Sequence, residues 1–533
     1  MLRALNAAVI VALLVAPVYA QPAEVLPRAK TPEDVGLSSE RLARVRTVTA
    51  GHIETGHVPG AVILVARHGK IAYFESLGFR DRAAGAPMTK DALFRIYSMT
   101  KPITSVAVMM LVEEGRLQIS DPVSRYLPEL SKPKVAVEKP DGAGGKTLEV
   151  VDAPREITVQ DLLRHTSGFT YGTRGDSLVH RAYREARVGS RDDTNADLVA
   201  KLGRLPLLHA PATRWEYGVS TDVLGRLVEV VSGMPLGQFF EGRIFRPLGM
   251  TDTAFWVPAD KMSRAAQPWQ RPDGPPMTPR FDVAVRARYE SGGGGLVAST
   301  LDYLRFTTML LNGGELGGVR LLGRKTVEFM TADHLGSIPI AAPGLGFGLG
   351  FQVRREPGVA GLPGSTGEYG WAGNGGTLFW IDPQERLIAL YMVQVSDFDR
   401  LLLRNQFRTM VQSAIADAPA LRARTPQPGT GGPSAGKRGA VCRRQSSTAA
   451  WHRCPRVSSI CRAGADRVVR GRRDPPRAVR DVRASPRRSR ARRCPDRYAP
   501  GRGGARATPR PSNATSTSRS SPTRWRTDPD ARG

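Results

Sequence analysis

The chain has 533 residues, of which 24 % are charged, and its formal net charge is +28. This charge is uneven: residues 421–533 contain 29 Lys and Arg but only 6 Asp and Glu, so residues 1–420 are close to neutral. All four cysteines also lie in residues 421–533, which excludes a disulfide framework and a cysteine nucleophile from the rest of the chain.

Residues 1–20, "MLRALNAAVIVALLVAPVYA", have the pattern of a secretory signal peptide. Arg3 precedes an apolar run, and small residues stand before Gln21, where cleavage is expected. A membrane anchor is the alternative, but the apolar run is short for a membrane span. The pattern therefore predicts a periplasmic or secreted protein, and we expect no membrane span after the signal is removed.

The first half of the remaining chain predicts a helix, a hairpin and then a mostly helical region. Ser38 or Ser39 caps a helix whose apolar residues recur at helical spacing. Two β-rich runs surround the turn "RHGK", which indicates a β-hairpin. Further helical patterns begin after Thr158 and lie at 219–232 and 236–245.

The second half predicts one helix, a series of strands and a terminal helix. Ser299 and Asp302 form a capping-box pair at the start of the helix, and Gly313 ends it. The later elements are β-rich runs at 346–354, 376–383 and 386–395 and an amphipathic helix at 401–417. This order predicts an α+β fold: one antiparallel sheet built from both chain ends, flanked by N- and C-terminal helices, with a mostly helical subdomain.

Residues 421–533 differ in kind from residues 21–420, which we expect to form the folded domain. They are rich in Arg, Pro, Ser, Ala and Gly, show no hydrophobic period, and cannot bury enough apolar surface to fold. Three interpretations remain: an arginine-rich arm that binds nucleic acid, a disordered extension without function, or out-of-frame translation of GC-rich DNA. A nucleic-acid arm behind a secretory signal makes little sense, and we expect no nucleic-acid partner for the folded domain.

The stretch "YSMTKP" at 97–102 opens the most apolar helical run after the signal peptide. Pro102 suits a first helical turn, and residues three apart share one helix face, so Lys101 can reach Ser98. The free N–H groups of a helix N-terminus favour an oxyanion beside Ser98. We expect burial to lower the pKa of Lys101, so that its neutral amine activates the serine. The plain alternative is a capping serine beside a surface lysine.

With this S-x-x-K pair, four further stretches resemble the motifs of the penicillin-recognising serine hydrolase superfamily. They are "LLRHTSGF" (162–169), "WEYGVSTDVLG" (215–225), "GGGGLVASTLDYLRF" (292–306) and "GEYGWAGNGGTLFWIDP" (367–383). The resemblance runs from about Thr31 to about Ala418 and implies a β-lactamase/transpeptidase-like fold. It also implies a small-molecule ester or amide substrate, and no cofactor.

Two departures from class C β-lactamases are informative. Their Tyr-x-Asn motif is Tyr217-Gly218-Val219 here, and their Lys-Thr-Gly motif is Trp371-Ala372-Gly373, so an indole replaces the cation that would hold a β-lactam carboxylate. Family VIII carboxylesterases carry Trp-Gly-Gly at this place. The resemblance therefore points to an esterase.

Carried over by position, the resemblance makes Ser98 the nucleophile and gives the acid–base work to Lys101 and Tyr217. The backbone N–H groups of Ser98 and Asn374 would bind the oxyanion. Trp371 and Gly373 would line the substrate site, although Trp371 also fits ordinary sheet packing.

Three function classes remain open from the sequence. They are a secreted esterase that forms an acyl-enzyme, a β-lactamase or D-alanyl-D-alanine carboxypeptidase of the same fold, and a non-catalytic binding protein. Ser434 in "GPSAG" lacks the strand and helix that a nucleophile elbow needs, and His165 is expected to be structural. The eight histidines show no metal-ligand spacing, so no metal is expected.

Overall fold

The computed structural model describes residues 26–417 apart from 143, 270–280, 341 and 396–399. The chain divides into two units near residue 432, and all described residues belong to the first unit. The expected signal peptide at 1–20, the cysteines, Ser434 and the 421–533 segment lie outside the described residues. No helix among the described residues is long and apolar enough to cross a membrane.

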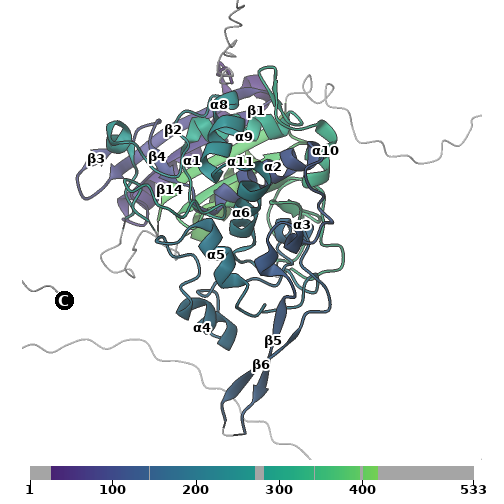
Figure 1. The fold of residues 1–533 in the computed structure, drawn as a ribbon. Coiled ribbons are helices and arrows are strands. Elements are labelled where there is room, and N and C mark those ends of the chain that lie inside the picture. The colour runs from purple at the N-terminus through teal and green to yellow at the C-terminus, as the bar shows by residue number, and fades with distance from the viewer. Residues whose placement is uncertain (1–25, 143, 270–280, 341, 396–399, 418–533) are drawn as a thin grey trace, which may run out of the picture. The chain divides into compact units, whose positions relative to one another are not determined.

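Within the described residues, eight strands form one antiparallel sheet in the order β10-β11-β12-β13-β14-β1-β2-β3. Their bounds are β1 (Gly60–Arg67), β2 (Lys70–Asp81), β3 (Ala86–Pro87), β10 (Leu345–Phe347), β11 (Gln352–Arg354), β12 (Tyr369–Ala372), β13 (Gly376–Asp382) and β14 (Leu387–Gln394). Figure 1 shows β1 and β2, from the N-terminal part, beside β14 from the C-terminal part. The predicted α+β fold with a sheet built from both chain ends is confirmed.

Shorter strands and the helices complete the unit. Two-stranded sheets are formed by β4 (Leu93–Arg95) with β7 (Val297–Ser299), β5 (Lys134–Pro140) with β6 (Lys146–Asp152), and β8 (Glu315–Leu316) with β9 (Val319–Arg320). The helices are α1 (Ser39–Glu54), α2 (Thr100–Glu113), α3 (Val159–Leu163), α4 (Leu178–Glu185), α5 (Asn195–Leu202), α6 (Ser220–Ser232), α7 (Leu236–Phe240), α8 (Arg246–Leu248), α9 (Thr300–Leu311), α10 (Arg324–Met330) and α11 (Arg400–Ser413).

The central strands are apolar at nearly every position because both faces of the sheet are buried. Along β1, Ala61, Ile63 and Val65 join a cluster with side chains of α1 and α11. The alternate residues Val62 and Leu64 join a second cluster that includes α2 and α9. Successive side chains of a strand point to opposite faces, so α1 and α11 cover one face and α2 and α9 the other.

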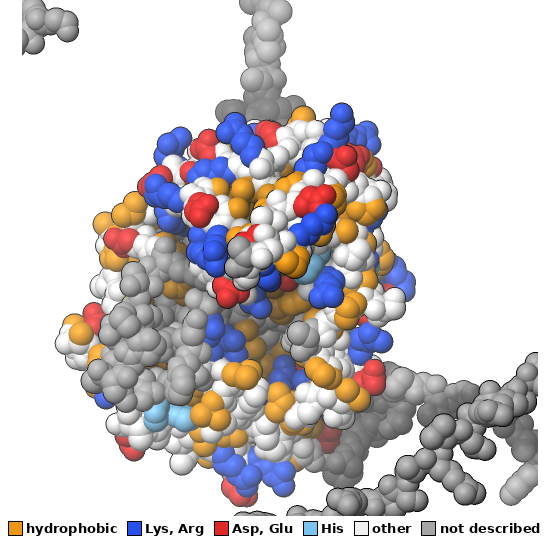
Figure 2. Space-filling model, turned by 90° about the horizontal axis from the view of Figure 1, so that it is seen from below, with side chains coloured by type: hydrophobic (Ala, Val, Ile, Leu, Met, Phe, Trp, Pro, Cys, Tyr) orange, Lys and Arg blue, Asp and Glu red, His pale blue; other side chains and the backbone are white. Residues whose placement is uncertain are grey.

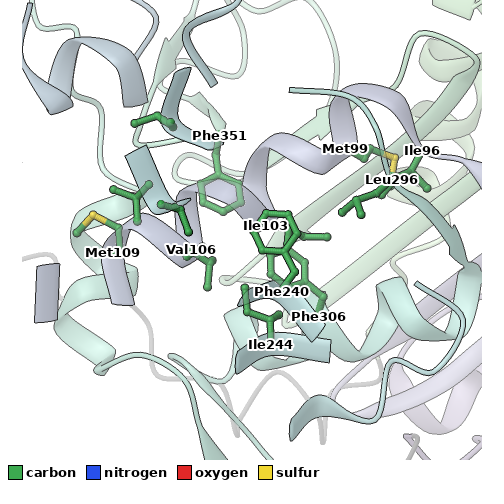
Figure 3. Close-up of a cluster of buried hydrophobic side chains, with 14 of the residues drawn as sticks. Ile96, Met99, Ile103, Val106, Met109, Phe240, Ile244, Leu296, Phe306 and Phe351 are labelled. Carbon is green, nitrogen blue, oxygen red and sulfur yellow. The ribbon is translucent and has the colours of Figure 1, made fainter. Parts of the chain in front are cut away.

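Helix α2 lies in the middle of the second cluster, and its residues from Thr100 to Leu111 are buried. In Figure 3, Ile103 and Val106 of α2 lie among Phe240, Phe306 and Phe351, which come from three other segments. Burying one such side chain contributes about 1.5–3 kcal/mol. The helix that follows Ser98 is therefore fixed on all sides, as its apolar sequence predicts.

Several local predictions are confirmed and three need correction. Ser38 caps α1 and Thr158 caps α3 as predicted. Ser299 caps α9, but the carboxylate of Asp302 accepts from Thr253 and from the backbone of Asp252 instead of closing a capping box.

The other two corrections concern strands. The run at 346–354 is not one strand, because it bends between β10 and β11, which pair with each other. The hairpin of β5 and β6, which the sequence analysis missed, extends away from the sheet beyond α3, α4 and α5 in Figure 1.

A buried arginine ties the two ends of the described chain to the sheet. Arg67, at the end of β1, is 3 % exposed and pairs with Glu385 and Asp417, each at 2.5 Å. Its guanidinium also donates to the carbonyls of Val35 and Gly36. A buried charge is tolerated only when it is paired and hydrogen-bonded, so the structure needs the chain as far as Asp417.

We predict that a chain ending at Ala420 has the same free energy of unfolding as the full chain. A chain ending at Ser413 should be less stable by at least about 1.5–3 kcal/mol, because Arg67 loses the charged hydrogen bond to Asp417. Urea unfolding of the three proteins tests this. A lower stability of the Ala420 form would show that the domain boundary is wrong.

Candidate active site

Ser98 lies in a tight turn between β4 and α2. The turn spans Tyr97–Met99, and Tyr97 has a φ of +45°, which is strained for a residue with a side chain. The Tyr97 ring packs edge-on against Phe281, with ring centroids 5.8 Å apart. Such strain persists only where packing enforces it, and here it presents Ser98 at the first turn of the helix, where backbone N–H groups lack intrahelical acceptors.

Lys101 is 1 % exposed and lies directly beneath Ser98. Its Nζ donates to three oxygens: Ser98 Oγ at 3.4 Å, Tyr171 OH at 3.0 Å and the Gly293 carbonyl at 2.6 Å. An ammonium group has three N–H donors, so each has an acceptor. The geometry therefore fits a protonated lysine.

The surroundings of Lys101 correct the expectation that its pKa falls. Burial alone would lower the pKa of Lys101, but the hydroxyls of Tyr171 and Tyr217 and the carboxylate of Asp222 outweigh it and raise the pKa above its ordinary value. The sequence analysis counted only the loss of water. With its pKa raised, Lys101 is a cation in the resting site.

Asp222 and the glycine run hold the acceptor that Lys101 uses. The carboxylate of Asp222 accepts from Tyr289 OH, from Ser291 Oγ and, at 3.1 Å, from the backbone N–H of Gly293. A Cβ on Gly293 would collide with this carboxylate. The glycine run at 292–295 thus lets the backbone approach close enough to offer its carbonyl to Lys101.

Two tyrosines face Lys101, and they are held differently. Tyr217 lies with its ring centroid 4.8 Å from Lys101 Nζ, and its hydroxyl accepts from the indole N–H of Trp371 at 3.3 Å. Tyr171 accepts from Lys101 directly, and burial raises the pKa of its phenol. The sequence analysis named Tyr217 and missed Tyr171. Tyr171 stands two residues after the motif "LLRHTSGF", and this position was the signal in the sequence that could have identified it.

The end of β12 meets the Ser98 turn through a glycine. A Cβ on Gly373 would collide with the carbonyl of Ile96 and with Thr377, so only glycine fits. The next residue, Asn374, is fixed by Arg400, whose guanidinium donates to its carbonyl at 2.9 Å and to its side-chain oxygen at 2.5 Å. The third motif is therefore held rigidly beside the serine.

A cavity of about 700 Å³ opens above these groups. It is lined by five residues proposed from the sequence: Ser98, Tyr217, Trp371, Gly373 and Asn374. The sixth, Lys101, lies buried behind Ser98. The structure thus brings all six predicted site residues together from three separate segments.

The comparisons with known proteins agree with this arrangement. The family model named Beta-lactamase matches residues 45–408, most of the described chain. The chain belongs to the β-lactamase family. The family model and the esterase among the relatives support a serine hydrolase, so the chain is an enzyme of this kind.

The relatives include esterases. Protein Rv1367c of Mycobacterium tuberculosis is 38 % identical over 357 residues, which cover 64 % of this chain and 87 % of the relative. Esterase EstB of Burkholderia gladioli is 33 % identical over 365 residues, with 64 % and 87 % covered. The solved structure of EstCE1, a hydrolase with promiscuous acyltransferase activity, is 26 % identical, covers 71 % of this chain and 98 % of its own, and has a TM-score of 0.58.

In this site of a β-lactamase family member, His165 has a structural role, which is to pack against the aromatic side chains around Tyr217. Its ring packs against Tyr217 with centroids 5.0 Å apart and against Trp215 and Phe347. Burial holds the pKa of His165 well below its ordinary value, so the ring is neutral. It supports the tyrosine and does not form a triad with Ser98. The described residues contain no group of three His, Cys, Asp or Glu that could hold a metal.

We predict that Asp222→Asn lowers the pKa of Lys101, because it removes a negative charge that stabilises the ammonium. NMR titration of protein labelled with ¹³C-lysine, with the Lys101 signal assigned from Lys101→Ala, measures this. Asp302→Asn is the matched control, since Asp302 is a buried carboxylate that contacts Thr253 instead. Equal Lys101 titration in wild type and Asp222→Asn would contradict the electrostatic account.

Proposed function

We propose that this serine hydrolase cleaves carboxylic esters through an acyl-enzyme formed on Ser98. The observation that carries the proposal is the contact of Ser98 Oγ with the buried ammonium of Lys101, at the floor of an open cavity. A serine hydroxyl becomes an effective nucleophile when a neighbouring group takes its proton. Ser98, Lys101 and Tyr217 supply the nucleophile and the proton path.

In the first step, Ser98 Oγ bonds to the ester carbonyl carbon, and its proton passes to the Lys101–Tyr217 pair. The carbonyl oxygen becomes an oxyanion that the backbone N–H groups of Ser98 and Asn374 bind; one such donor is worth about 10²–10³ in rate. The bond from carbon to the alcohol oxygen then breaks, and the alcohol leaves with that proton. Water repeats the sequence on the acyl-enzyme and releases the acid.

The resting charge of Lys101 assigns the two roles. A protonated lysine cannot accept the serine proton, so we assign that step to Tyr217 in its phenolate form. Tyr217 first releases its phenol proton to solvent in the open cavity, and Lys101, whose Nζ lies 4.8 Å from the centre of the ring, stabilises the phenolate, which then takes the proton of Ser98. Tyr217 then hands a proton to the leaving alkoxide. General acid–base steps of this kind typically contribute about 10²–10⁴-fold.

Trp371 supports an ester over a β-lactam substrate. Its indole stands at the cavity wall, donates to Tyr217 and packs against Phe347, with ring centroids 5.3 Å apart. An aromatic wall favours an apolar acyl chain. The names of EstB and of a lovastatin esterase from Penicillium rubens, 30 % identical over 370 residues, point the same way.

One observation favours the second candidate, a β-lactamase or D-alanyl-D-alanine carboxypeptidase. Arg400 lines the cavity beside Asn374 and places a cation near the position that Trp371 leaves uncharged. Nitrocefin, assayed beside p-nitrophenyl esters of increasing acyl length, separates the two candidates. From residues 1–20 we also propose that the enzyme acts in the periplasm or outside the cell.

We predict that Ser98→Ala abolishes hydrolysis of p-nitrophenyl butyrate while the melting temperature stays within a few degrees, because the substitution removes only a hydroxyl. A fluorophosphonate probe should label wild type at Ser98, as peptide mass spectrometry would locate it. Labelling at Ser434, or full activity of the alanine variant, would rule out the assignment.

We predict that Tyr217→Phe lowers kcat by about 10²–10⁴-fold with little change in KM, because only proton transfer is lost. Trp371→Phe is the comparison, since it removes the indole donor to Tyr217 but keeps an aromatic wall. Its kcat should fall much less. Steady-state kinetics on the same ester decide the point, and a loss below tenfold in Tyr217→Phe would refute its role.

A further inference from the structure

Two cavities, not one, meet at Ser98. The second has a volume of about 530 Å³ and shares Ser98, Arg174, Tyr217, Asn374 and Arg400 with the larger cavity. An ester has an acyl half and an alcohol half joined at the carbonyl carbon that Ser98 attacks. Two cavities that meet at the nucleophile therefore suit the two halves of one ester.

The lining side chains indicate which half enters which cavity. Tyr217, which hands the proton to the leaving alkoxide, lines both cavities, so the proton path fits either orientation. The larger cavity is also lined by the apolar side chains of Leu345, Leu362 and Trp371, which suit an apolar acyl chain. We therefore place the acyl half in the larger cavity and the alcohol half in the second.

The second cavity carries a strong positive charge. Five of its lining side chains are arginines: Arg174, Arg184, Arg187, Arg191 and Arg400. Among its described lining residues the one acidic side chain is Asp222, whose carboxylate already accepts from Tyr289, Ser291 and Gly293. Figure 2 shows a hollow near the centre of one face of the molecule, with Lys and Arg side chains gathered around it.

Two of these arginines have no carboxylate partner in the part of the chain that the structure describes. Arg174 stacks over Tyr217, with Cζ 5.2 Å from the ring centroid, and Arg191 stacks over Phe281 at 4.8 Å. Burial lowers the pKa of Arg191, which shows that water only partly solvates its charge. By contrast, Arg187 pairs with Asp192, and Arg184 donates to two loop carbonyls.

We propose that the second cavity is an alcohol-side subsite that binds a carboxylate, with Arg174 and Arg191 as its ligands. The planar guanidinium matches a carboxylate with two parallel hydrogen bonds, and the partial burial of Arg191 strengthens such bonds at that residue. The substrate class is then an ester whose acyl group is apolar and whose alcohol is an acid. This inference rests on the proposed ester hydrolysis at Ser98.

The test compares the release of butyrate from two esters whose alcohol carries either a carboxylate or the uncharged methyl ester of that carboxylate. They are 4-carboxyphenyl butyrate and its methyl ester, 4-(methoxycarbonyl)phenyl butyrate. The measured quantity is the ratio of kcat/KM for the anionic ester to that for the neutral ester, each divided by its rate of hydrolysis in buffer. We expect a ratio above ten for the full wild-type chain, since a charged hydrogen bond is worth about tenfold or more.

Arg174→Gln and Arg191→Gln should each lower this ratio by about tenfold, and the double variant should bring it near one. Arg181→Gln is the matched control. It removes the same charge from α4, but Arg181 is exposed and does not line either cavity, so the wild-type ratio should remain. The ratio compares two substrates of one protein, so partial unfolding of a variant does not affect it.

The outcomes separate the two proposals. A wild-type ratio near one, or equal ratios in Arg181→Gln and the two subsite variants, overturns the carboxylate subsite while ester hydrolysis at Ser98 still stands. Hydrolysis of the neutral ester by Ser98→Ala at the wild-type rate overturns the proposed function itself. A high ratio that falls only in the subsite variants supports both.

Discussion

The arrangement of this site depends on the need of one buried ammonium group, that of Lys101, for hydrogen-bond acceptors. Lys101 has almost no contact with water, and an ion of this kind costs several kcal/mol unless protein groups replace its hydration. The three acceptors come from its own turn, from the loop after α3 and from the glycine run before β7. Satisfying one charge therefore brings together segments that are up to about two hundred residues apart in sequence.

Close approach of backbone segments is the second requirement, and it explains the glycines in the motifs. Gly293 leaves room for the carboxylate of Asp222, and Gly373 leaves room for the carbonyl of Ile96. In both places a side chain would push apart elements whose contact defines the site. The strained φ of Tyr97 belongs to the same packing, since a Cβ on Gly375 would collide with its ring. The catalytic geometry is thus fixed by the fold before any substrate binds.

The sequence predicted best those features of the structure that depend on interactions between residues close together in the chain. The caps of Ser38 and Thr158, the hairpin around "RHGK" and the buried helix after Ser98 depend on neighbouring residues, and they are where the pattern predicts them. The pKa of Lys101 was predicted in the wrong direction because it depends on Tyr171 and Asp222. These groups reach the lysine only through tertiary packing, and no spacing in the sequence reveals their distance.

This site differs from the β-lactamase pattern more in the position of its positive charges than in their number. At the third motif the cation is replaced by Trp371, which adds an aromatic wall to the larger cavity and a donor for Tyr217. Arginines supply positive charge around Ser98 instead, because Arg174 and Arg400 line both cavities and Arg174 stacks on the same tyrosine. Lys101 and Arg174 both lie near the Tyr217 ring, so one phenol feels the catalytic cation and the cation of the second cavity. Binding at the second cavity and proton transfer at Tyr217 are therefore electrostatically coupled, because an anion that neutralises Arg174 changes the field at the group that moves the proton.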